Sequence, residues 1–358
     1  MYKKLRIAQV APLWYTVPPE KYGGVEKIAA YLTDGLVKKG HEVTLFASPG
    51  SKTKAKNLVS IFHKPLREAG VSWDNKYWDL MNLSEAVRRA GKGAFDIVHN
   101  HIDAAEVFFA GLNKIPVIST IHSGIYFNKQ ANEYYQTRYE ILKAGRNNLN
   151  AVFISKKLKN LVGFNFKKSC VIYNGIDTKK FAFNASPDDY FLWAGRIEKK
   201  KGVENAIEAV SRIGGRLIIA GRIDEISKQY FTDAVKPKLN KKIRYIGELN
   251  ENELADIYGR AQAFLYPIEW EEPFGLVVME AMACGTPVIA YRRGSMEELI
   301  KDGKSGFVID SDIEKLVEAM RNVDKIDRRA VRKHVEDNFS KERMVDEYEK
   351  LYFKLCSK

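Results

Sequence analysis

Two glutamates, Glu272 and Glu280, are the side chains whose spacing best fits ligand-binding chemistry. If the turns between them are helical, their carboxylates lie about 12 Å apart along the helix axis, too far for a shared proton relay. Backbone amides at a helix start attract an anion such as a diphosphate. A ligand with a hydroxyl-rich ring at each end and an anion between them fits this layout, and a nucleotide-sugar is such a ligand.

An apolar strand and a helix must position these carboxylates. Residues 263–266 are predicted to form a strand, an acidic loop follows, and the next segment has a helical composition until Gly285 and Pro287 end it. Pro273 is expected at the helix start, where a missing N–H costs nothing.

A long run around the two glutamates carries a family resemblance. The run contains EPFGL at 272–276, Glu280, and AMACGTPVI at 281–289. It resembles the paired-glutamate signature of family 4 of the retaining glycosyltransferases. The resemblance spans the chain and implies an α/β fold of the GT-B architecture, in which two Rossmann-like domains with parallel sheets face each other across a cleft and a C-terminal helix crosses back to the first domain.

The resemblance also implies which residues bind the donor. Arg196 offers a planar fork of donors and Lys201 a point charge, and both can stabilise a departing diphosphate without a metal. Glu272 would hold hexose hydroxyls and Glu280 the ribose. The full set of expected donor-binding residues is Gly23, Gly24, Arg196, Lys201, Gly247, Glu272, Phe274, Gly275, Leu276, Val277 and Glu280.

His122 follows the predicted strand 116–121, and polar residues at the carboxyl ends of parallel strands line α/β ligand sites. The resemblance implies that His122 contacts the transferred sugar, so the expected catalytic residues are His122, Arg196, Lys201 and Glu272. The other interpretation is a histidine satisfied by a neighbouring carbonyl, and it is the favoured one for His101. Gly23 and Gly24 fit either a close approach to donor phosphates or a tight turn.

The function that follows is retaining, metal-independent transfer of a hexose from a nucleoside-diphosphate sugar to a hydroxyl acceptor, in the synthesis of glycans, lipid-linked saccharides or glycoconjugates. The donor is taken as a UDP-sugar, with UDP-glucose as the default from family frequency, and no cofactor is implied. Three alternatives stay open: a glycoside hydrolase, a catalytically silent subunit that binds nucleotide-sugars, and a GT-B sugar-nucleotide epimerase. A hydrolase requires its carboxyl pair about 5–9.5 Å apart, which the helical spacing disfavours.

The length of 358 residues fits two domains. We predict an N-terminal Rossmann-like acceptor-side domain at 1–172, a C-terminal Rossmann-like nucleotide-sugar-binding domain at 173–339, and a helix at 340–358 that packs back on the N-terminal domain. A polar linker is expected at 178–190.

Strand and helix patterns alternate in both halves. Strands are predicted in the first half at 5–11, 43–47, 96–99, 116–121, 151–155 and 170–173, and in the second half at 191–194, 216–220, 243–246, 263–266, 288–291 and 306–309. No clean strand is expected within 51–95.

The net charge of +13 lies entirely in the first half, because residues 1–172 hold 26 Lys and Arg against 13 Asp and Glu. This excess fits either an anionic partner, such as an acidic membrane surface, or a lysine-rich solvated surface. Nucleic acid is not expected because no nucleic-acid motif accompanies the charge.

The compartment follows from the cysteines and the apolar runs. Cys170, Cys284 and Cys356 are far apart and odd in number, which argues against disulfides or a zinc site and for a reducing cytosol. No segment reaches membrane-spanning length. We therefore expect a cytoplasmic protein that is peripheral at the inner face of the membrane if the basic half binds lipid.

Overall fold

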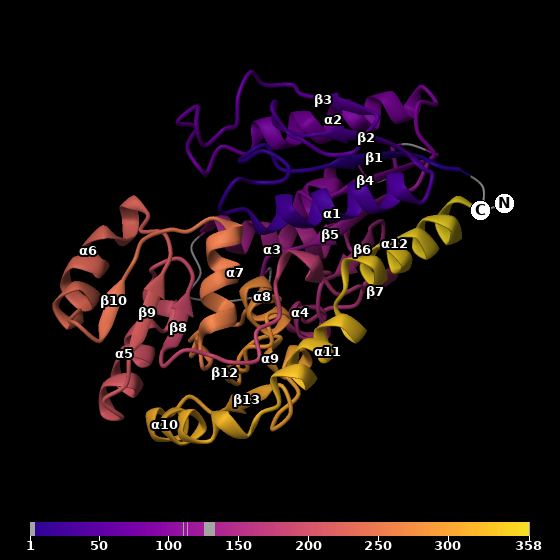
Figure 1. Ribbon diagram of the computed structural model, residues 1–358. Coiled ribbons are helices and arrows are strands. Elements are labelled where there is room, and N and C mark those ends of the chain that lie inside the picture. The colour runs from indigo at the N-terminus through magenta and orange to yellow at the C-terminus, as the bar shows by residue number, and fades with distance from the viewer. Residues whose placement is uncertain (1–3, 110, 113, 125–132, 358) are drawn as a thin grey trace. The chain divides into compact units, whose positions relative to one another are not determined.

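The computed structural model describes residues 4–357 except 110, 113 and 125–132. The chain divides into two compact units (Figure 1). Unit 1 comprises Met1–Gly175 and Lys341–Lys358, and unit 2 comprises Ile176–Ser340. Each unit is a parallel β-sheet with helices, so the predicted α/β fold class is confirmed.

Unit 1 contains a seven-stranded parallel sheet in the order β3-β2-β1-β4-β5-β6-β7. The chain runs outward from β1 in both directions, which is a doubly wound arrangement. Its strands are β1 (Arg6–Val10), β2 (Glu42–Phe46), β3 (Asn57–Val59), β4 (Ile97–Asn100), β5 (Val117–Ile121), β6 (Asn150–Phe153) and β7 (Lys168–Val171).

Helices cover both faces of this sheet. The helices are α1 (Gly24–Lys38), α2 (Tyr77–Gly91), α3 (Glu133–Gly145), α4 (Lys156–Leu161) and α12 (Lys341–Cys356), with a 3-10 turn, η1, at Asp103–Phe108. Leu83 of α2 packs with Ala8 and Val10 on one face. Side chains alternate along a strand, so Gln9 points to the opposite face. There its amide Nε2 donates a hydrogen bond of 3.0 Å to the Tyr352 hydroxyl of α12.

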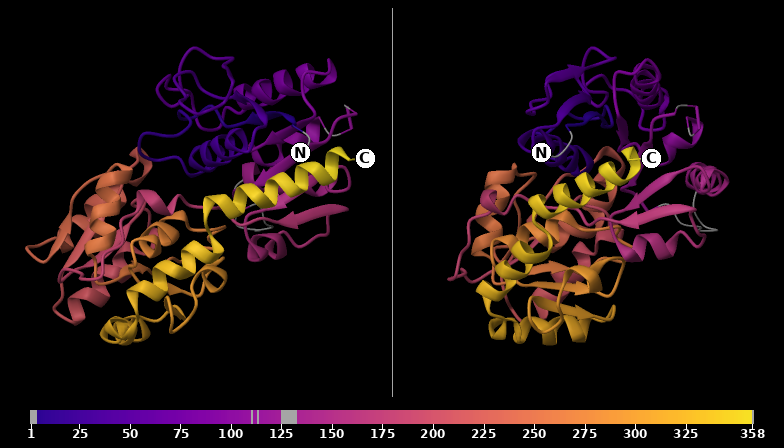
Figure 2. Two further views of the ribbon diagram at one scale, coloured as in Figure 1. Left: turned by 45° about the vertical axis from the view of Figure 1, so that its right-hand side comes forward. Right: turned by 90° about the vertical axis from the view of Figure 1, so that its right-hand side faces the viewer.

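The C-terminal helix α12 therefore belongs to unit 1. Helices α1 and α12 lie side by side (Figure 2). A Cβ added to Gly35 of α1 would lie 2.4 Å from Val345 Cγ2 of α12, so the missing side chain lets the two helices approach closely.

Unit 2 contains a six-stranded parallel sheet in the order β10-β9-β8-β11-β12-β13. The strands are β8 (Phe191–Ala194), β9 (Leu217–Ala220), β10 (Ile243–Tyr245), β11 (Phe264–Tyr266), β12 (Val288–Tyr291) and β13 (Gly306–Ile309). The helices are α5 (Val203–Arg212), α6 (Lys228–Tyr230), α7 (Glu251–Arg260), α8 (Leu276–Ala283), α9 (Met296–Leu299), α10 (Ile313–Arg321) and α11 (Arg328–Asn338).

Three local predictions were wrong. The region 51–95 contains a short strand, β3, whose three residues are too few to show a clear alternation. Pro273 precedes α8, which begins at Leu276 after the cap residue Gly275. The polar linker expected at 178–190 is instead a packed part of unit 2, because Phe181 is 1% exposed and the Asp188 amide donates to the Arg260 carbonyl at 2.7 Å.

Candidate functional site

Two loops meet at the carboxyl edge of the unit 2 sheet. They are 195–202, which follows β8, and 267–275, which follows β11, and their strands are neighbours. The Glu269 amide donates to the Lys200 carbonyl at 2.8 Å. Gly202 has a φ of 71°, and a Cβ there would lie 1.8 Å from the Pro267 carbonyl oxygen. The two loops are thus held together by backbone packing that only glycine permits.

This contact brings Lys201 and Glu272 together. Lys201 Nζ lies 2.7 Å from Glu272 Oε2, and each side chain is only 12% exposed. The same oxygen accepts hydrogen bonds from the Tyr266 hydroxyl at 2.6 Å and from Trp270 Nε1 at 3.1 Å. Within the part of the chain that the structure describes, no group donates to the second oxygen, Oε1. One carboxylate oxygen is therefore fixed by three donors while the other keeps its acceptor capacity.

Aromatic rings also hold the Lys201 ammonium. Its Nζ lies 4.6 Å from the centroid of the Trp270 ring and 6.0 Å from that of Tyr266. A cation over an aromatic face is attracted by the ring quadrupole. Lys201 is consequently a fixed positive charge beside Glu272.

Arg196 lies on the same loop but has a different ion-pair partner. Its Nη1 is 2.7 Å from Glu198 Oε1, and the other oxygen of Glu198 is 3.1 Å from Lys200 Nζ. The Arg196 side chain is 30% exposed. The structure thus pairs Lys201 with Glu272 and leaves Arg196 nearer to solvent.

The start of α8 is shaped by Gly275, which caps the helix with a φ of 96°. Because the helix begins only at Leu276, the path from Glu272 to Glu280 is not one continuous helix, and the axial spacing of about 12 Å does not apply. Phe274 and Val277 lie on either side of this cap. Phe274 is buried, whereas Val277 is partly exposed.

A neighbouring loop supports the segment before α8. The Ser295 amide donates to the Glu272 carbonyl at 3.0 Å, and its hydroxyl donates to the Phe274 carbonyl at 2.6 Å. A Cβ on Gly294 would lie 2.1 Å from the Glu272 carbonyl oxygen. The loop that contains Gly294 and Ser295 therefore packs directly against residues 272–274 and fixes their backbone.

Glu280 lies inside α8 and is 4% exposed. Burial raises the pKa of the nearby Cys284 thiol to about 12, and the negative charge of Glu280 adds to that rise. The described contacts place Glu280 beside Cys284 and Tyr258, and they do not join it to Glu272.

Three glycines follow three neighbouring strands of unit 2: Gly195 after β8, Gly221 after β9 and Gly247 after β10. A Cβ on Gly221 would lie 1.7 Å from the Gly195 carbonyl oxygen. The Gly221 amide donates to the Gly247 carbonyl at 2.7 Å. The backbones of these three strand ends therefore pack against one another without side chains.

In unit 1, Gly23 and Gly24 stand at the start of α1. Gly23 has a φ of 150°, and a Cβ there would lie 2.8 Å from Pro19 Cβ, so the turn itself requires glycine. In the first turn of α1, burial raises the pKa of Glu26 to about 8. Glu26 is thus predominantly a neutral acid at pH 7.

His122 follows β5 and is partly buried. Its ring Nε2 lies 3.0 Å from His101 Nδ1, and its backbone N–H donates to Asp103 Oδ1 at 2.9 Å. Burial lowers the pKa of His122 to about 4, although the negative charge of Asp103 opposes this shift. His122 is therefore neutral at pH 7, and its ring partner is another histidine and not a carbonyl.

Asp103 organises the backbone around His122. It adopts a φ of 32°, and its carboxylate accepts from the Ser123 hydroxyl at 2.6 Å and from Arg138 Nη2 at 2.5 Å. The Arg138 charge contributes to lowering the pKa of Asp103, although burial opposes this shift. A charged Asp103 thus holds the turn that presents His122.

Sequence reasoning did not assign roles to Tyr266, Trp270, Asp103 or Arg138. Tyr266 and Trp270 stand within six positions before Glu272, at the end of the predicted strand 263–266 and in the acidic loop, so their proximity in sequence was a usable signal. Asp103 also follows a strand, which indicated the correct sheet edge. Arg138 gave no local signal, because its partner lies 35 positions away.

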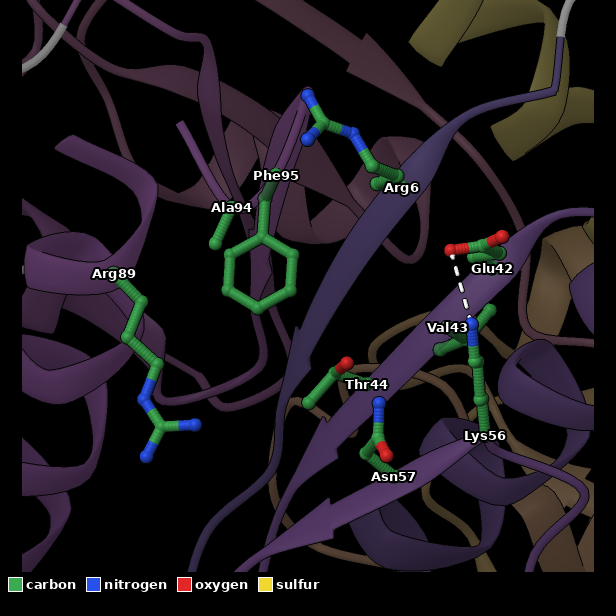
Figure 3. Close-up of a pocket in the computed structure, with 9 residues that line it drawn as sticks. All are labelled: Arg6, Glu42, Val43, Thr44, Lys56, Asn57, Arg89, Ala94 and Phe95. Carbon is green, nitrogen blue, oxygen red and sulfur yellow. Dashed lines mark ion pairs between the residues drawn. The ribbon is translucent and has the colours of Figure 1, made fainter. Parts of the chain in front are cut away.

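A pocket of about 260 Å³ lies elsewhere in unit 1, at the amino ends of β1, β2 and β3 (Figure 3). Lys56 pairs with Glu42 in it at 3.6 Å. This is the sheet edge opposite to His122. The lining residues are Arg6, Glu42, Val43, Thr44, Lys56, Asn57, Arg89, Ala94 and Phe95.

The described residues contain neither a cluster that could hold a metal ion nor a helix that could span a membrane. In those parts of the chain, no group of three or more His, Cys, Asp or Glu is arranged to hold a metal ion. No described helix is both long and apolar enough to cross a membrane.

Comparisons with known proteins place this geometry in context. A family model described as "Glycosyltransferase Family 4" matches residues 22–180, and one described as "Glycosyl transferases group 1" matches residues 176–338. An uncharacterized glycosyltransferase of Methanocaldococcus jannaschii is 28% identical over 340 residues, which are 83% of this chain and 84% of the relative.

Solved structures show the same fold. Sucrose-phosphate synthase from Thermosynechococcus elongatus matches with a TM-score of 0.83 at 20% identity, over 99% of this chain and 100% of that one. Anabaena HepE in complex with UDP and glucose matches with a TM-score of 0.75 at 15% identity, over 98% and 100% of the two chains. These likenesses confirm the predicted GT-B fold.

Proposed function

The chain belongs to the glycosyltransferases of family 4, and on this premise we propose that it transfers a hexose from a nucleoside-diphosphate sugar to a hydroxyl acceptor with retention of the anomeric configuration. The observation that carries the proposal is the Glu272 carboxylate, which has one oxygen held by Lys201, Tyr266 and Trp270 and the other available as an acceptor.

The donor roles follow from charge and position. A diphosphate would lie against the fixed Lys201 ammonium, the Arg196 guanidinium and the free amides at the start of α8. These groups stabilise the negative charge that develops on the leaving diphosphate, and no metal is required for that role. Glu272 Oε1 would accept from hexose hydroxyls, and Glu280 would bind the ribose.

Backbone groups and unit 1 supply the remaining proposed contacts. Gly247, Phe274, Gly275, Leu276 and Val277 would contact the donor, as would Gly23 and Gly24. In unit 1, His122 would hydrogen-bond to the transferred sugar. We favour UDP as the nucleotide because Anabaena HepE, a protein of the same fold, is described in complex with UDP and glucose.

Substitution of the two proposed donor contacts tests the function. Arg196→Ala should lower transfer by about 100-fold or more, the scale for losing one group that stabilises developing charge. Glu272→Ala should also lower transfer strongly, because the hexose hydroxyls lose their acceptor. Activity is measured with a panel of UDP-, ADP- and GDP-sugars and saccharide acceptors, and circular dichroism checks the fold. Wild-type turnover in either variant would contradict the assignment.

The stereochemistry and the metal requirement have separate tests. Proton NMR of the product should show the same anomeric configuration as the donor, and EDTA should leave the rate unchanged. Donor-dependent stabilisation in a thermal-shift assay without turnover on any acceptor would instead favour a silent binding subunit.

An anionic membrane surface is the partner that we propose for the basic half of the chain. Lys156, Lys167 and Lys168 are exposed around α4 and β7. Sedimentation with vesicles containing an anionic phospholipid should carry the protein down, and 0.5 M salt should release it, because charge attraction at a surface is screened at about 4 Å at that ionic strength. No sedimentation at low salt would refute this partner.

A further inference from the structure

A buried chain of hydrogen bonds connects His122 to the C-terminal helix. His122 Nε2 lies 3.0 Å from His101 Nδ1, and His101 Nε2 lies 2.9 Å from Gln9 Oε1. Gln9 Nε2 donates to the Tyr352 hydroxyl at 3.0 Å. Gln9 and Tyr352 are fully buried and His101 is 1% exposed, so water does not compete for these groups.

The hydrogen-bonded series continues beyond Tyr352 to a third histidine. The Tyr352 hydroxyl lies 2.6 Å from His99 Nδ1, and His99 Nε2 lies 2.8 Å from Thr120 Oγ1. Thr120 Oγ1 is 2.7 Å from the Tyr348 hydroxyl, which marks the other end. His99 and His101 lie two residues apart on or just after β4, as Thr120 and His122 do on or just after β5, so the strand alternation places them on one face.

The orientation of the Gln9 amide sets the direction of these bonds, because its Nε2 meets Tyr352 and its Oε1 meets His101. Its Oε1 can only accept, so His101 Nε2 carries a hydrogen and donates to it. A neutral histidine has one hydrogen, which leaves His101 Nδ1 as an acceptor. His122 Nε2 must then donate to His101 Nδ1, and the hydrogen of neutral His122 is on Nε2.

Both histidines are held in their neutral forms. Burial lowers the pKa of His101 well below its ordinary value, and a positive charge on His99 or His122 would lower it further. Burial likewise lowers the pKa of His122 to about 4. Both rings are therefore neutral across the physiological pH range.

We propose that Gln9 and His101 are positioning residues that hold His122 in a single tautomer, with the hydrogen on Nε2 and the lone pair of Nδ1 available to a substrate O–H. Among the described residues none hydrogen-bonds to His122 Nδ1. An acceptor nitrogen binds a hydroxyl group and does not bind an ionised phosphate oxygen, which has no hydrogen to donate. Under the proposed function, the group that meets His122 Nδ1 is thus a sugar hydroxyl. The tautomer of His122 does not depend on that function.

Histidine NMR tests the tautomer without any substrate. The full-length protein, labelled with 15N at its six histidines, is studied at pH 7.5, and the His122 signals are assigned by their loss in His122→Asn. The expected result is a protonated Nε2 and an unprotonated Nδ1. In Gln9→Leu the acceptor for His101 is lost, and the His122 signals should move toward the average of two tautomers.

A matched control uses the two tyrosines of α12. Tyr352→Phe removes the hydroxyl that receives the Gln9 hydrogen bond, so it frees the Gln9 amide to rotate and should alter the His122 spectrum. Tyr348→Phe removes a hydroxyl from the same helix at the far end of the hydrogen-bonded series and should leave the His122 spectrum unchanged.

Kinetics separate positioning from a merely structural role. His101→Leu should lower kcat by about fivefold to tenfold, the scale of one hydrogen bond, with little change in the donor KM. His101→Asn places an amide oxygen near the Nδ1 position and should recover most of kcat.

Two results would overturn the proposal. A hydrogen on Nδ1 of His122 at pH 7.5 would mean that the hydrogen bonds run in the opposite direction. An unchanged His122 spectrum in Gln9→Leu would show that these hydrogen bonds do not set the tautomer. Full activity of His122→Asn alongside the expected spectrum would refute the substrate contact alone. The proposed transferase function fails separately, through wild-type turnover of Glu272→Ala.

Discussion

Lys201 and Glu272 form an ion pair of 2.7 Å between Nζ and Oε2, although 71 positions separate them in the chain. The pair joins the loop after β8 to the loop after β11. Tyr266 and Trp270 donate to the same oxygen, so the carboxylate keeps its orientation when no ligand is bound.

Replacing the lysine separates its charge from its packing. Lys201→Met keeps the apolar stem and removes the ammonium, and we expect kcat/KM for the nucleotide-sugar to fall about 100-fold because the charge on the leaving diphosphate loses a fixed partner. Lys199→Met is the matched control, since Lys199 is exposed on the same turn. Equal losses in the two variants would contradict a specific role for Lys201.

Glu26 should make the stability of the protein depend on pH between about 4.5 and 8. Burial raises its folded-state pKa to about 8 from an ordinary value of 4.5, so the native protein binds a proton that the unfolded chain releases between these values. The stability from this proton is fully present below about pH 4.5 and is lost as the pH rises to about 8.

The variant Glu26→Gln tests this dependence. It keeps the shape of a neutral acid and cannot ionise, so its melting temperature should fall less than that of wild type between pH 5 and pH 9. Parallel curves for the two proteins would refute a buried neutral Glu26. Glu68→Gln, at an exposed position, is the control.

Gly35 and Val345 should form a compensating pair at the contact of α1 with α12. Gly35→Ala places a Cβ 2.4 Å from Val345 Cγ2, and overpacking of this kind costs about 1–3 kcal/mol. In Gly35→Ala/Val345→Ala the clash is removed, and the loss of unfolding free energy should be smaller than the sum of the two single losses. Urea denaturation of the four proteins measures this coupling, and strictly additive losses would contradict the contact.

Gly221→Ala should damage the unit 2 sheet edge more than a glycine substitution in open space. Its Cβ would overlap the Gly195 carbonyl oxygen at 1.7 Å. Gly303→Ala is the matched control, because Gly303 has a φ of 68° and nothing within 4 Å of an added Cβ. The control should lose about 1–2 kcal/mol from the left-handed backbone alone. Gly221→Ala should lose clearly more and should weaken nucleotide binding in a thermal-shift assay.

Local patterns predicted most of the architecture. The strands β8, β12 and β13 have the predicted bounds, and their apolar runs are short, continuous and closed by glycine or polar residues. β8 and β12 are buried along their whole length, as expected inside a parallel sheet, whereas Phe307 and Ile309 of the edge strand β13 are partly exposed. Continuous apolar composition bounded by such residues indicates these strands. The three-residue β3 gave no such signal, and Pro273 suggested a helix start that the cap at Gly275 places three residues later.

The candidate site was predicted in part. The motif run indicated Glu272 and Gly275 as site residues, and the spacing of positive residues after β8 indicated Lys201. The helical spacing of Glu272 and Glu280 was wrong because a non-helical segment precedes α8. The roles assigned to these residues remain proposals, whereas the ion pair of Lys201 with Glu272 is a structural fact.

By itself the sequence determined the class of fold and the family, because periodic apolar runs and a long motif are local properties of the chain. Only the tertiary structure decided the surroundings of His122, because Gln9 and Tyr352 lie 343 positions apart and meet through the packing of α12 on unit 1. Burial and hydrogen-bond direction depend on all the neighbours of a side chain, and no local pattern specifies them.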